Sequence, residues 1–81
     1  MPTVFIMPMN LMHVGNILKE RRLELGFTQQ ELEERSGVTQ SMISKLENGT
    51  AHNISVEALR KLAKALNCSV TDLLPEEDKR P

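Results

Sequence analysis

The chain has 81 residues, the length of one small domain, and a domain of this size buries only about 60% of the surface that its unfolded chain exposes. Its 10 basic and 11 acidic residues give a formal net charge of −1, which argues against a strongly basic nucleic-acid-binding surface. One cysteine excludes an internal disulfide, no cysteine and histidine spacing matches a zinc site, and the lack of tryptophan and tyrosine argues against a stacking platform for single strands or RNA.

The N-terminal arm, residues 1–12, is apolar, and Pro2 and Pro8 flank its segment Thr-Val-Phe-Ile-Met. This segment can form a short strand that pairs with a second protomer. Free chain ends are usually disordered unless the fold holds them, so a flexible arm is the alternative. The arm lacks the basic start and cleavage site of a signal peptide, and no run of 18 apolar residues occurs, so we expect a cytoplasmic protein that does not span a membrane.

Apolar residues recur at helical spacing between Val14 and Leu25, which predicts a first helix over this stretch. Gly26 is expected to end this helix, because glycine adopts the left-handed conformation of a helix C-terminus without steric cost. Phe27 comes next, and we expect its ring to fill part of the core.

The segment that follows predicts a second helix and a tight turn. Thr28 and Glu31 have the spacing of a capping box, in which the hydroxyl and the carboxylate each satisfy a free backbone amide. This box predicts a helix over residues 28–35. Gly37 suits the turn after it, because a short turn between crossed helices requires a positive φ, which glycine adopts freely.

Thr39 is expected to cap a third helix that ends at Leu46 or Glu47. Its inward face would carry Met42, Ile43 and Leu46, and its outward face Gln40, Ser41, Ser44 and Lys45. Two short helices around a glycine turn, with small polar side chains at the start of the second, are the layout of a helix-turn-helix. In that motif the start of the second helix meets base edges in the major groove of DNA.

The remaining sequence predicts two further helices. Ser55 would cap a fourth helix, and Asn67 would end it in a left-handed conformation. Its apolar stripe would consist of Val56, Leu59, Leu62, Ala63 and Leu66. Ser69 and Asp72 resemble a second capping box, which starts a short fifth helix before the charged tail, residues 75–81. Five short helices joined by short loops predict an all-α domain.

The order and spacing of many residues resemble those of one known family. The pattern is Arg22-(x5)-Thr28-Gln29-(x2)-Leu32-(x4)-Gly37-Val38-Thr39-Gln40-Ser41-(x)-Ile43-Ser44-(x)-Leu46-Glu47-Asn48-Gly49, followed by Leu59-(x2)-Leu62-Ala63-(x2)-Leu66 and Val70-(x2)-Leu73-Leu74. It is similar to the Cro/repressor-type helix-turn-helix family, also called the xenobiotic-response-element family. The resemblance implies a five-helix, lambda-repressor-like DNA-binding domain over residues 13–74, with the motif at residues 28–47.

The resemblance also implies roles for individual side chains. The DNA-binding residues would be Gln29, Thr39, Gln40, Ser41, Ser44, Lys45, Asn48 and Thr50. Gln29 would hold a DNA phosphate and brace Gln40, whose amide can both donate to and accept from an adenine edge. Asn48 and the loop at Thr50 would approach the DNA backbone. Arg22 and Glu47 would form a partly buried ion pair that ties the first helix to the end of the third.

Two positions depart from the family pattern. Glu33 stands where the family usually has alanine, so its carboxylate must turn outward or the two motif helices must separate slightly. The proline common in the loop before the fourth helix is absent, and the loop that contains Asn53 and Ile54 is about one residue longer than is typical. The second departure weakens any assignment of DNA contacts to this loop.

We therefore expect a sequence-specific binder of double-stranded DNA, a transcriptional repressor that acts as a homodimer on a palindromic operator, without a metal, a cofactor or enzymatic activity. Dimer contacts would come from Val4, Phe5, Ile6, Val70, Leu73 and Leu74. The alternative is an antitoxin-like or other protein-interaction module that covers a toxin or another protein partner, with DNA binding secondary. The acidic balance, Glu33 and the apolar arm favour this alternative.

Overall fold

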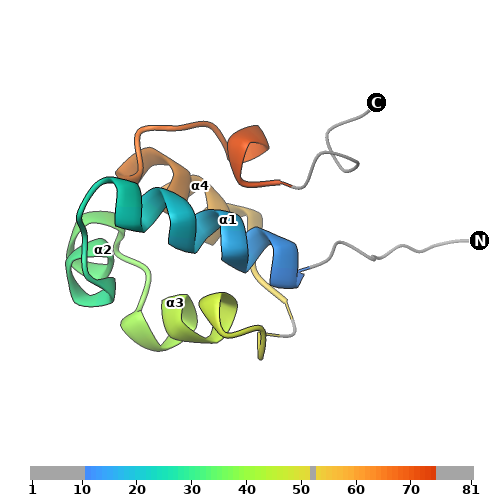
Figure 1. The fold of residues 1–81 in the computed structure, drawn as a ribbon. Coiled ribbons are helices and arrows are strands. Elements are labelled where there is room, and N and C mark those ends of the chain that lie inside the picture. The colour runs from blue at the N-terminus through green and yellow to red at the C-terminus, as the bar shows by residue number, and fades with distance from the viewer. Residues whose placement is uncertain (1–10, 52, 75–81) are drawn as a thin grey trace, which may run out of the picture.

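The computed structural model describes residues 11–51 and 53–74, and every regular element in these ranges is helical. The elements are α1 (Leu11–Glu24), α2 (Gln29–Ser36), α3 (Gln40–Glu47), α4 (Val56–Ala65) and the short 3₁₀ helix η1 (Val70–Leu73). Figure 1 shows α1 crossing in front of α4, with α2 at one end and α3 below. The predicted all-α fold is confirmed. Within the described ranges, no helix has both the length and the apolar character needed to cross a bilayer.

The predicted caps start the helices. The Thr28 hydroxyl accepts a hydrogen bond from the Glu31 amide at 3.0 Å, and the Glu31 carboxylate accepts one from the Thr28 amide at 2.8 Å. Thr39 caps α3, and Ser55 caps α4 in the same way. Gly37, between α2 and α3, has a φ of 81°, which is the left-handed conformation that the turn requires. The chemistry of single residues therefore sets where the helices begin and turn.

The first helix begins earlier than predicted. It starts at Leu11 rather than Val14, so residues 11 and 12 belong to α1 and not to the arm. Its last residue is Glu24, and Gly26 follows with a φ of 77°. The rest of the predicted arm, including Val4, Phe5 and Ile6, and the tail at residues 75–81 lie outside the described residues.

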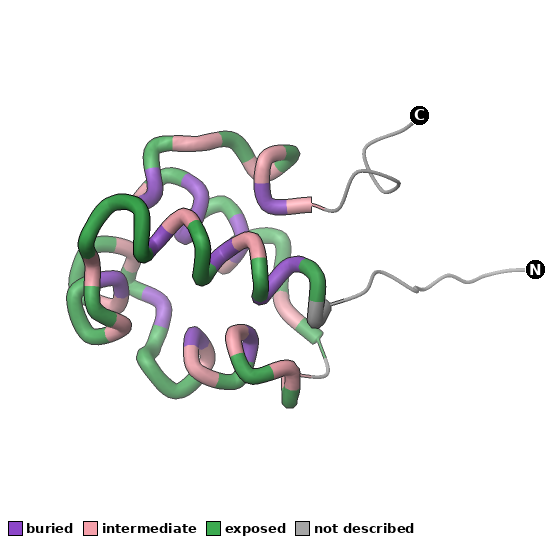
Figure 2. Tube along the Cα trace, viewed as in Figure 1, coloured by how far each residue is buried: buried purple, intermediate pink, exposed green. Residues whose placement is uncertain are grey.

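The core lies between the four α-helices, and Figure 2 shows buried positions on each of them. Its buried apolar residues are Val14, Leu18, Leu32, Val38, Ile43, Leu46, Leu59, Leu62, Ala63, Leu66 and Leu73. Phe27 is partly buried and packs against this core, as expected. Val56 was predicted to join the stripe of α4, but it is 61% exposed. It is the first residue of the helix, directly after the cap, and none of the described elements covers it.

The predicted fifth helix is a single 3₁₀ turn. Its capping box is present, because the Ser69 hydroxyl accepts from the Asp72 amide and the Asp72 carboxylate accepts from the Ser69 amide. The segment is short, since it follows the left-handed Asn67, with a φ of 59°, and is followed by Pro75. A proline disfavours the α conformation of the residue before it, and Leu74 is accordingly extended. The stretch between Asn67 and Pro75 therefore has room for only one helical turn.

A close contact between α1 and α3 fixes how near these two helices lie. Gly15, on α1, is buried, and a Cβ atom added to it would overlap the backbone carbonyl of Leu46 in α3. Only glycine allows the two backbones to approach so closely. The sequence alone does not predict this role for Gly15, because nothing near it in the chain indicates which backbone it meets.

Candidate nucleic-acid interface

Helix α3 has one buried face and one polar face. Ile43 and Leu46 are 0% and 1% exposed, so they anchor the helix in the core. The predicted DNA-binding residues of α3 and its cap lie on the other side, where Thr39, Gln40, Ser41 and Lys45 are exposed and Ser44 is half-buried. This arrangement leaves the polar face accessible to a duplex.

Gln40 is the first residue of α3, directly after the Thr39 cap, and it is exposed. Among the described residues, its side-chain amide makes no hydrogen bond within the chain. Both the donor and the acceptor of this amide are therefore available. A side-chain amide of this kind can pair in a bidentate manner with the major-groove edge of adenine.

The end of α3 is tied to α1 by a buried ion pair between Glu47 and Arg22. The Arg22 guanidinium donates from Nε to Glu47 Oε2 at 2.7 Å and from its second terminal nitrogen to Oε1 at 2.9 Å. Its third donor reaches the Phe27 carbonyl at 2.6 Å. The two side chains are 9% and 4% exposed, and hydrogen bonding to Glu47 raises the pKa of Arg22 above its ordinary value. A bidentate pair of this kind fixes the orientation of both groups.

Gln29 differs from the expectation. Its amide nitrogen donates to Glu47 Oε1 at 3.0 Å, so the brace to Gln40 that the resemblance implied is not formed in this structure. A carboxylate is a stronger acceptor than a neutral amide, which explains the preference. Gln29 is half-buried at the start of α2, so Glu47 orients the side chain that was expected to hold a DNA phosphate.

In the turn after α3, hydrogen bonds connect Asn48 and Thr50, the two loop residues predicted to approach the DNA backbone. Asn48 Oδ1 accepts hydrogen bonds from the Thr50 amide at 3.1 Å and from the Thr50 hydroxyl at 2.7 Å. The Lys45 carbonyl accepts from the amides of Thr50 and Ala51 at 2.9 and 3.1 Å. Asn48 and Thr50 are therefore exposed but held in place against the end of α3.

A recess of about 460 Å³ lies between α3 and this loop. It is lined by Met42, Lys45, Thr50, Ala51 and Asn53. Lys45 is the cation of this lining, and Asn53 adds an exposed amide that the sequence analysis did not assign to the site. The position of Asn53 in the longer loop was visible in the sequence, but its approach to α3 depends on how the loop folds back.

Glu33 does not open the helix pair. Its side chain is half-buried, and its carbonyl accepts a hydrogen bond from the Gly37 amide at 2.8 Å. Leu32 in α2 and Ile43 in α3 both remain 0% exposed. The departure from the family pattern at this position is therefore compatible with close packing of α2 and α3.

One expected dimer contact is wrong. Leu73 is 0% exposed and belongs to the chain's own core, so it cannot contact a partner while the domain is folded. The 3₁₀ turn directs this side chain inward. Val70 and Leu74 are half-buried and keep part of their apolar surface exposed. Val4, Phe5 and Ile6 lie outside the described residues.

Comparison with known families gives a match to the helix-turn-helix model HTH_3 over residues 18–73. The HTH-type transcriptional regulator SinR of Bacillus licheniformis is 37% identical over 65 residues, which are 80% of this chain and 59% of that protein. The chain thus spans about three fifths of the length of that curated relative.

Two solved structures are similar along most of their length. The restriction-modification controller protein C.AhdI from Aeromonas hydrophila has a TM-score of 0.74 and 33% identity, covering 79% of this chain and 96% of that one. SinR, the master regulator for biofilm formation, in complex with DNA, has a TM-score of 0.71 and 35% identity, covering 74% of this chain and 95% of that one. The arrangement of helices described above is therefore shared with regulatory proteins.

Proposed function

Because the chain belongs to the helix-turn-helix family, we propose that it binds double-stranded DNA of a defined sequence and regulates transcription. The observation that carries this proposal is the exposed polar face of α3, where Gln40 has no partner within the described part of the chain. The similarity to SinR, which has been solved in complex with DNA, supports DNA as the ligand.

In the proposed complex, the N-terminal end of α3 enters the major groove. Gln40 reads a base edge, and Ser41 and Lys45 contact neighbouring bases or phosphates. Gln29 donates its second amide hydrogen to a phosphate while Glu47 holds the first. The recess beside Lys45 receives a further backbone phosphate, with Thr50 and Asn53 on its wall.

We propose that two protomers act together as a repressor on a palindromic site. A symmetric dimer places its two reading helices about 34 Å apart, which matches one turn of duplex. The surfaces that remain for the dimer contact are Val70, Leu74 and the arm. A chain with one cation among its proposed DNA-binding residues gains from pairing, because the dimer doubles the charge that meets the duplex.

Selection of bound duplexes from a random pool tests this proposal. We expect enrichment of an inverted repeat whose half-sites lie one helical turn apart. The variant Gln40→Ala should bind the selected site more weakly by about 1–3 kcal/mol and should accept more sequences at one position. The matched control is Gln30→Ala, because Gln30 has the same side chain and is exposed on α2 outside the proposed site.

Two outcomes would contradict the proposal. If Gln40→Ala and Gln30→Ala had the same small effect, α3 would not be the reading helix. If the selected duplexes contained single half-sites without symmetry, the dimer on a palindrome would be wrong while sequence-specific binding would stand.

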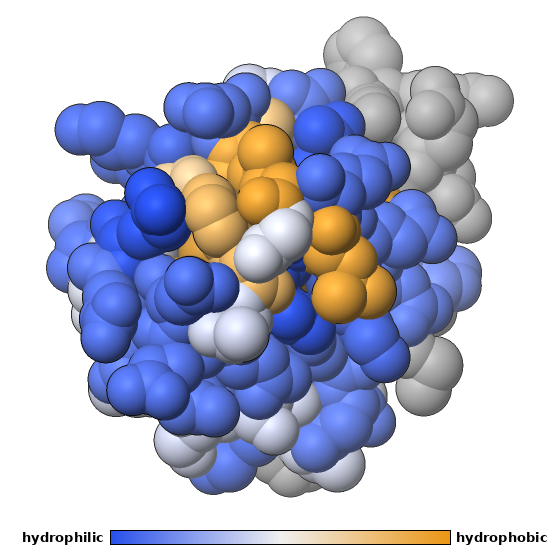
Figure 3. Space-filling view, turned by 60° about the vertical axis from the view of Figure 1, so that its left-hand side comes forward, coloured by the Kyte–Doolittle hydropathy of each residue, from blue (hydrophilic) through white to orange (hydrophobic). Residues whose placement is uncertain are grey.

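A protein-interaction module is the second candidate, and an exposed apolar patch favours it. Leu23 and Leu25, at and just after the end of α1, are 57% and 42% exposed. Figure 3, which brings this end of the molecule forward, shows apolar atoms gathered on a mostly hydrophilic face. SinR has also been solved together with SinI protein. Failure of the pure chain to enrich any duplex would favour this candidate over DNA binding.

A further inference from the structure

A second concave site lies between α2 and α4, and the DNA-binding proposal does not use it. Its cavity volume is about 670 Å³, which is within the usual range for small-molecule sites. Its lining consists of Phe27, Arg35, Ser36, Lys61, Lys64, Ala65 and Asn67. It shares no lining residue with the recess beside α3. The site is therefore separate from the proposed DNA-binding surface.

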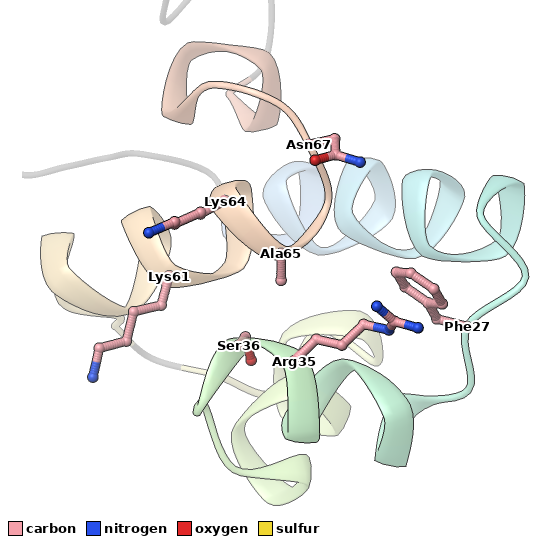
Figure 4. A pocket seen from close by; sticks show the side chains of 7 residues that line it. All are labelled: Phe27, Arg35, Ser36, Lys61, Lys64, Ala65 and Asn67. Atoms are coloured by element: carbon pink, nitrogen blue, oxygen red, sulfur yellow. The ribbon is translucent and has the colours of Figure 1, made fainter.

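The pocket is cationic. Its lining includes Arg35, Lys61 and Lys64 but no carboxylate. Among the described residues, none of the three pocket cations has an acidic group within 4.0 Å, so no direct acidic partner neutralises them. In sequence, Lys61 and Lys64 look like an ordinary solvated helix face. The fold brings Arg35 of α2 into the same pocket, with its side chain directed towards Phe27 and the two lysine side chains extending away from it (Figure 4).

The negative ends of two helix dipoles offset only part of this positive charge. The last turns of α2 and α4 both border the pocket, and Arg35 and Lys64 are the basic residues in those turns. A helix C-terminus carries about half of a negative charge, so the two ends together offset about one of the three positive charges. Roughly two positive charges remain for a ligand.

The arrangement of the cations indicates the shape of the ligand. Figure 4 shows Arg35 directed towards the Phe27 ring on one side of the pocket, and the lysines on α4 on the other side. The Arg35 guanidinium carbon lies 4.3 Å from the centre of that ring, which holds this cation in place. Ser36 and Asn67 supply a hydroxyl and an amide between the two ends. A ligand that reaches both ends must be extended and must carry more than one negative charge.

We propose that this pocket between α2 and α4 binds an extended, multiply charged small anion of the polyphosphate or polyphosphorylated type. Arg35 holds one charged end, and Lys61 and Lys64 hold the other. The hydroxyl of Ser36 can donate to the anion, because its oxygen already accepts a hydrogen bond from the Val38 amide at 3.0 Å.

The test is an NMR titration of the full 81-residue chain with sodium tripolyphosphate, with sodium chloride added to keep the ionic strength constant. We expect saturable shifts of the backbone amides of Ser36, Ala65 and Asn67. The double variant Lys61→Gln and Lys64→Gln should bind at least about tenfold more weakly, because it loses two charge-assisted contacts.

The matched control is the double variant Lys19→Gln and Arg60→Gln. Both residues are exposed, neither lines the pocket, and the change in net charge is the same. The control should keep the affinity of the natural chain within about twofold. Equal weakening in both double variants, or shifts that do not saturate, would overturn the proposal, because they would show general charge attraction.

Two further titrants distinguish an extended small anion from a single phosphate group and from the phosphates of DNA. Inorganic phosphate should bind more weakly than tripolyphosphate, and equal affinity would contradict an extended ligand. A short DNA duplex should leave the amides of Ser36, Ala65 and Asn67 unshifted. If the duplex shifted them in the natural chain but not in the Lys61→Gln and Lys64→Gln variant, the pocket would belong to a nucleic-acid surface and the small-anion proposal would fail.

Discussion

At the scale of single residues, Glu47 joins three helices of the candidate site. Its carboxylate is 4% exposed and accepts hydrogen bonds from Arg22 on α1 and from Gln29 on α2, while the residue itself ends α3. A buried charge is tolerated only when it is paired and hydrogen-bonded, and this one is. The orientation of Gln29, the proposed phosphate contact, therefore depends on the same carboxylate that stabilises the fold.

Replacing Glu47 by glutamine should lower the free energy of unfolding by about 3 kcal/mol, because the buried Arg22 charge loses its partner. Urea unfolding measures this change. The control Glu34→Gln removes an exposed carboxylate of α2 and should change stability by less than about 0.5 kcal/mol. Comparable losses in the two variants would show that the ion pair does not matter for the fold.

The thiol of Cys68 gives a pH-dependent prediction. Desolvation by burial raises its pKa, the nearby Arg21 charge lowers it, and Asp72 raises it, with a net shift above the ordinary value of 9.0. The folded thiol therefore stays protonated in a pH range where the unfolded thiol ionises, so this contribution to stability is present below pH 9.0 and is lost as pH rises through the folded pKa. Labelling with a thiol reagent should show a more alkaline midpoint in the native chain than in urea, and identical midpoints would contradict burial of the thiol.

At the scale of elements, the position of α3 depends on two glycines, each for a different reason. Gly37 provides the left-handed turn between α2 and α3, with a φ of 81°. Gly15 removes a side chain where α1 meets the Leu46 carbonyl. The first can be recognised from a local pattern, whereas the second depends on a contact between residues far apart in the chain. Gly37 sets the turn that leads into α3, and Gly15 sets how closely α3 approaches α1.

Replacing Gly15 by alanine should destabilise the domain by about 1–3 kcal/mol, because the new methyl group overlaps a backbone carbonyl that cannot rotate away. This loss exceeds the gain of about 0.5–1 kcal/mol that alanine brings to a helix interior. Thermal unfolding measures the net change in stability. The backbone amide shifts of α3 show whether the new methyl group displaces that helix. The control Asn16→Ala, at an exposed position of α1, should not destabilise the domain. A more stable Gly15→Ala variant would rule out the close approach of α1 and α3.

At the scale of the whole molecule, the distribution of charge matters more than its sum. The net charge is −1, yet three cations line the pocket between α2 and α4, and Lys45 of α3 is the cation in the lining of the recess between α3 and the loop that follows it. A small positive charge on the proposed DNA-binding face implies that few counterions leave the duplex when it binds. Specific binding then relies on hydrogen bonds to base edges and phosphates more than on charge.

The salt dependence of DNA binding tests how few positive charges lie on the proposed DNA-binding face. With one or two phosphates neutralised by each protomer, the slope of the logarithm of the affinity against the logarithm of the salt concentration should be about −2 to −4 for a dimer. Fluorescence anisotropy of a labelled, selected duplex over a salt series gives this slope. A slope near −10 would contradict the placement of the cations and would bring Arg35, Lys61 and Lys64 into the DNA interface.

The sequence alone was sufficient to predict the features that depend on residues close together in the chain. The capping box of Thr28 and Glu31, the turn at Gly37 and the polar face that begins at Gln40 each follow from local hydrogen bonding or backbone sterics. Only the tertiary structure determined that Gln29 turns to Glu47, that Leu73 is internal, that Gly15 meets Leu46 and that Arg35 lines the same pocket as the lysines of α4. These contacts join residues on different helices, and their geometry depends on how the helices pack, which no short stretch of sequence specifies.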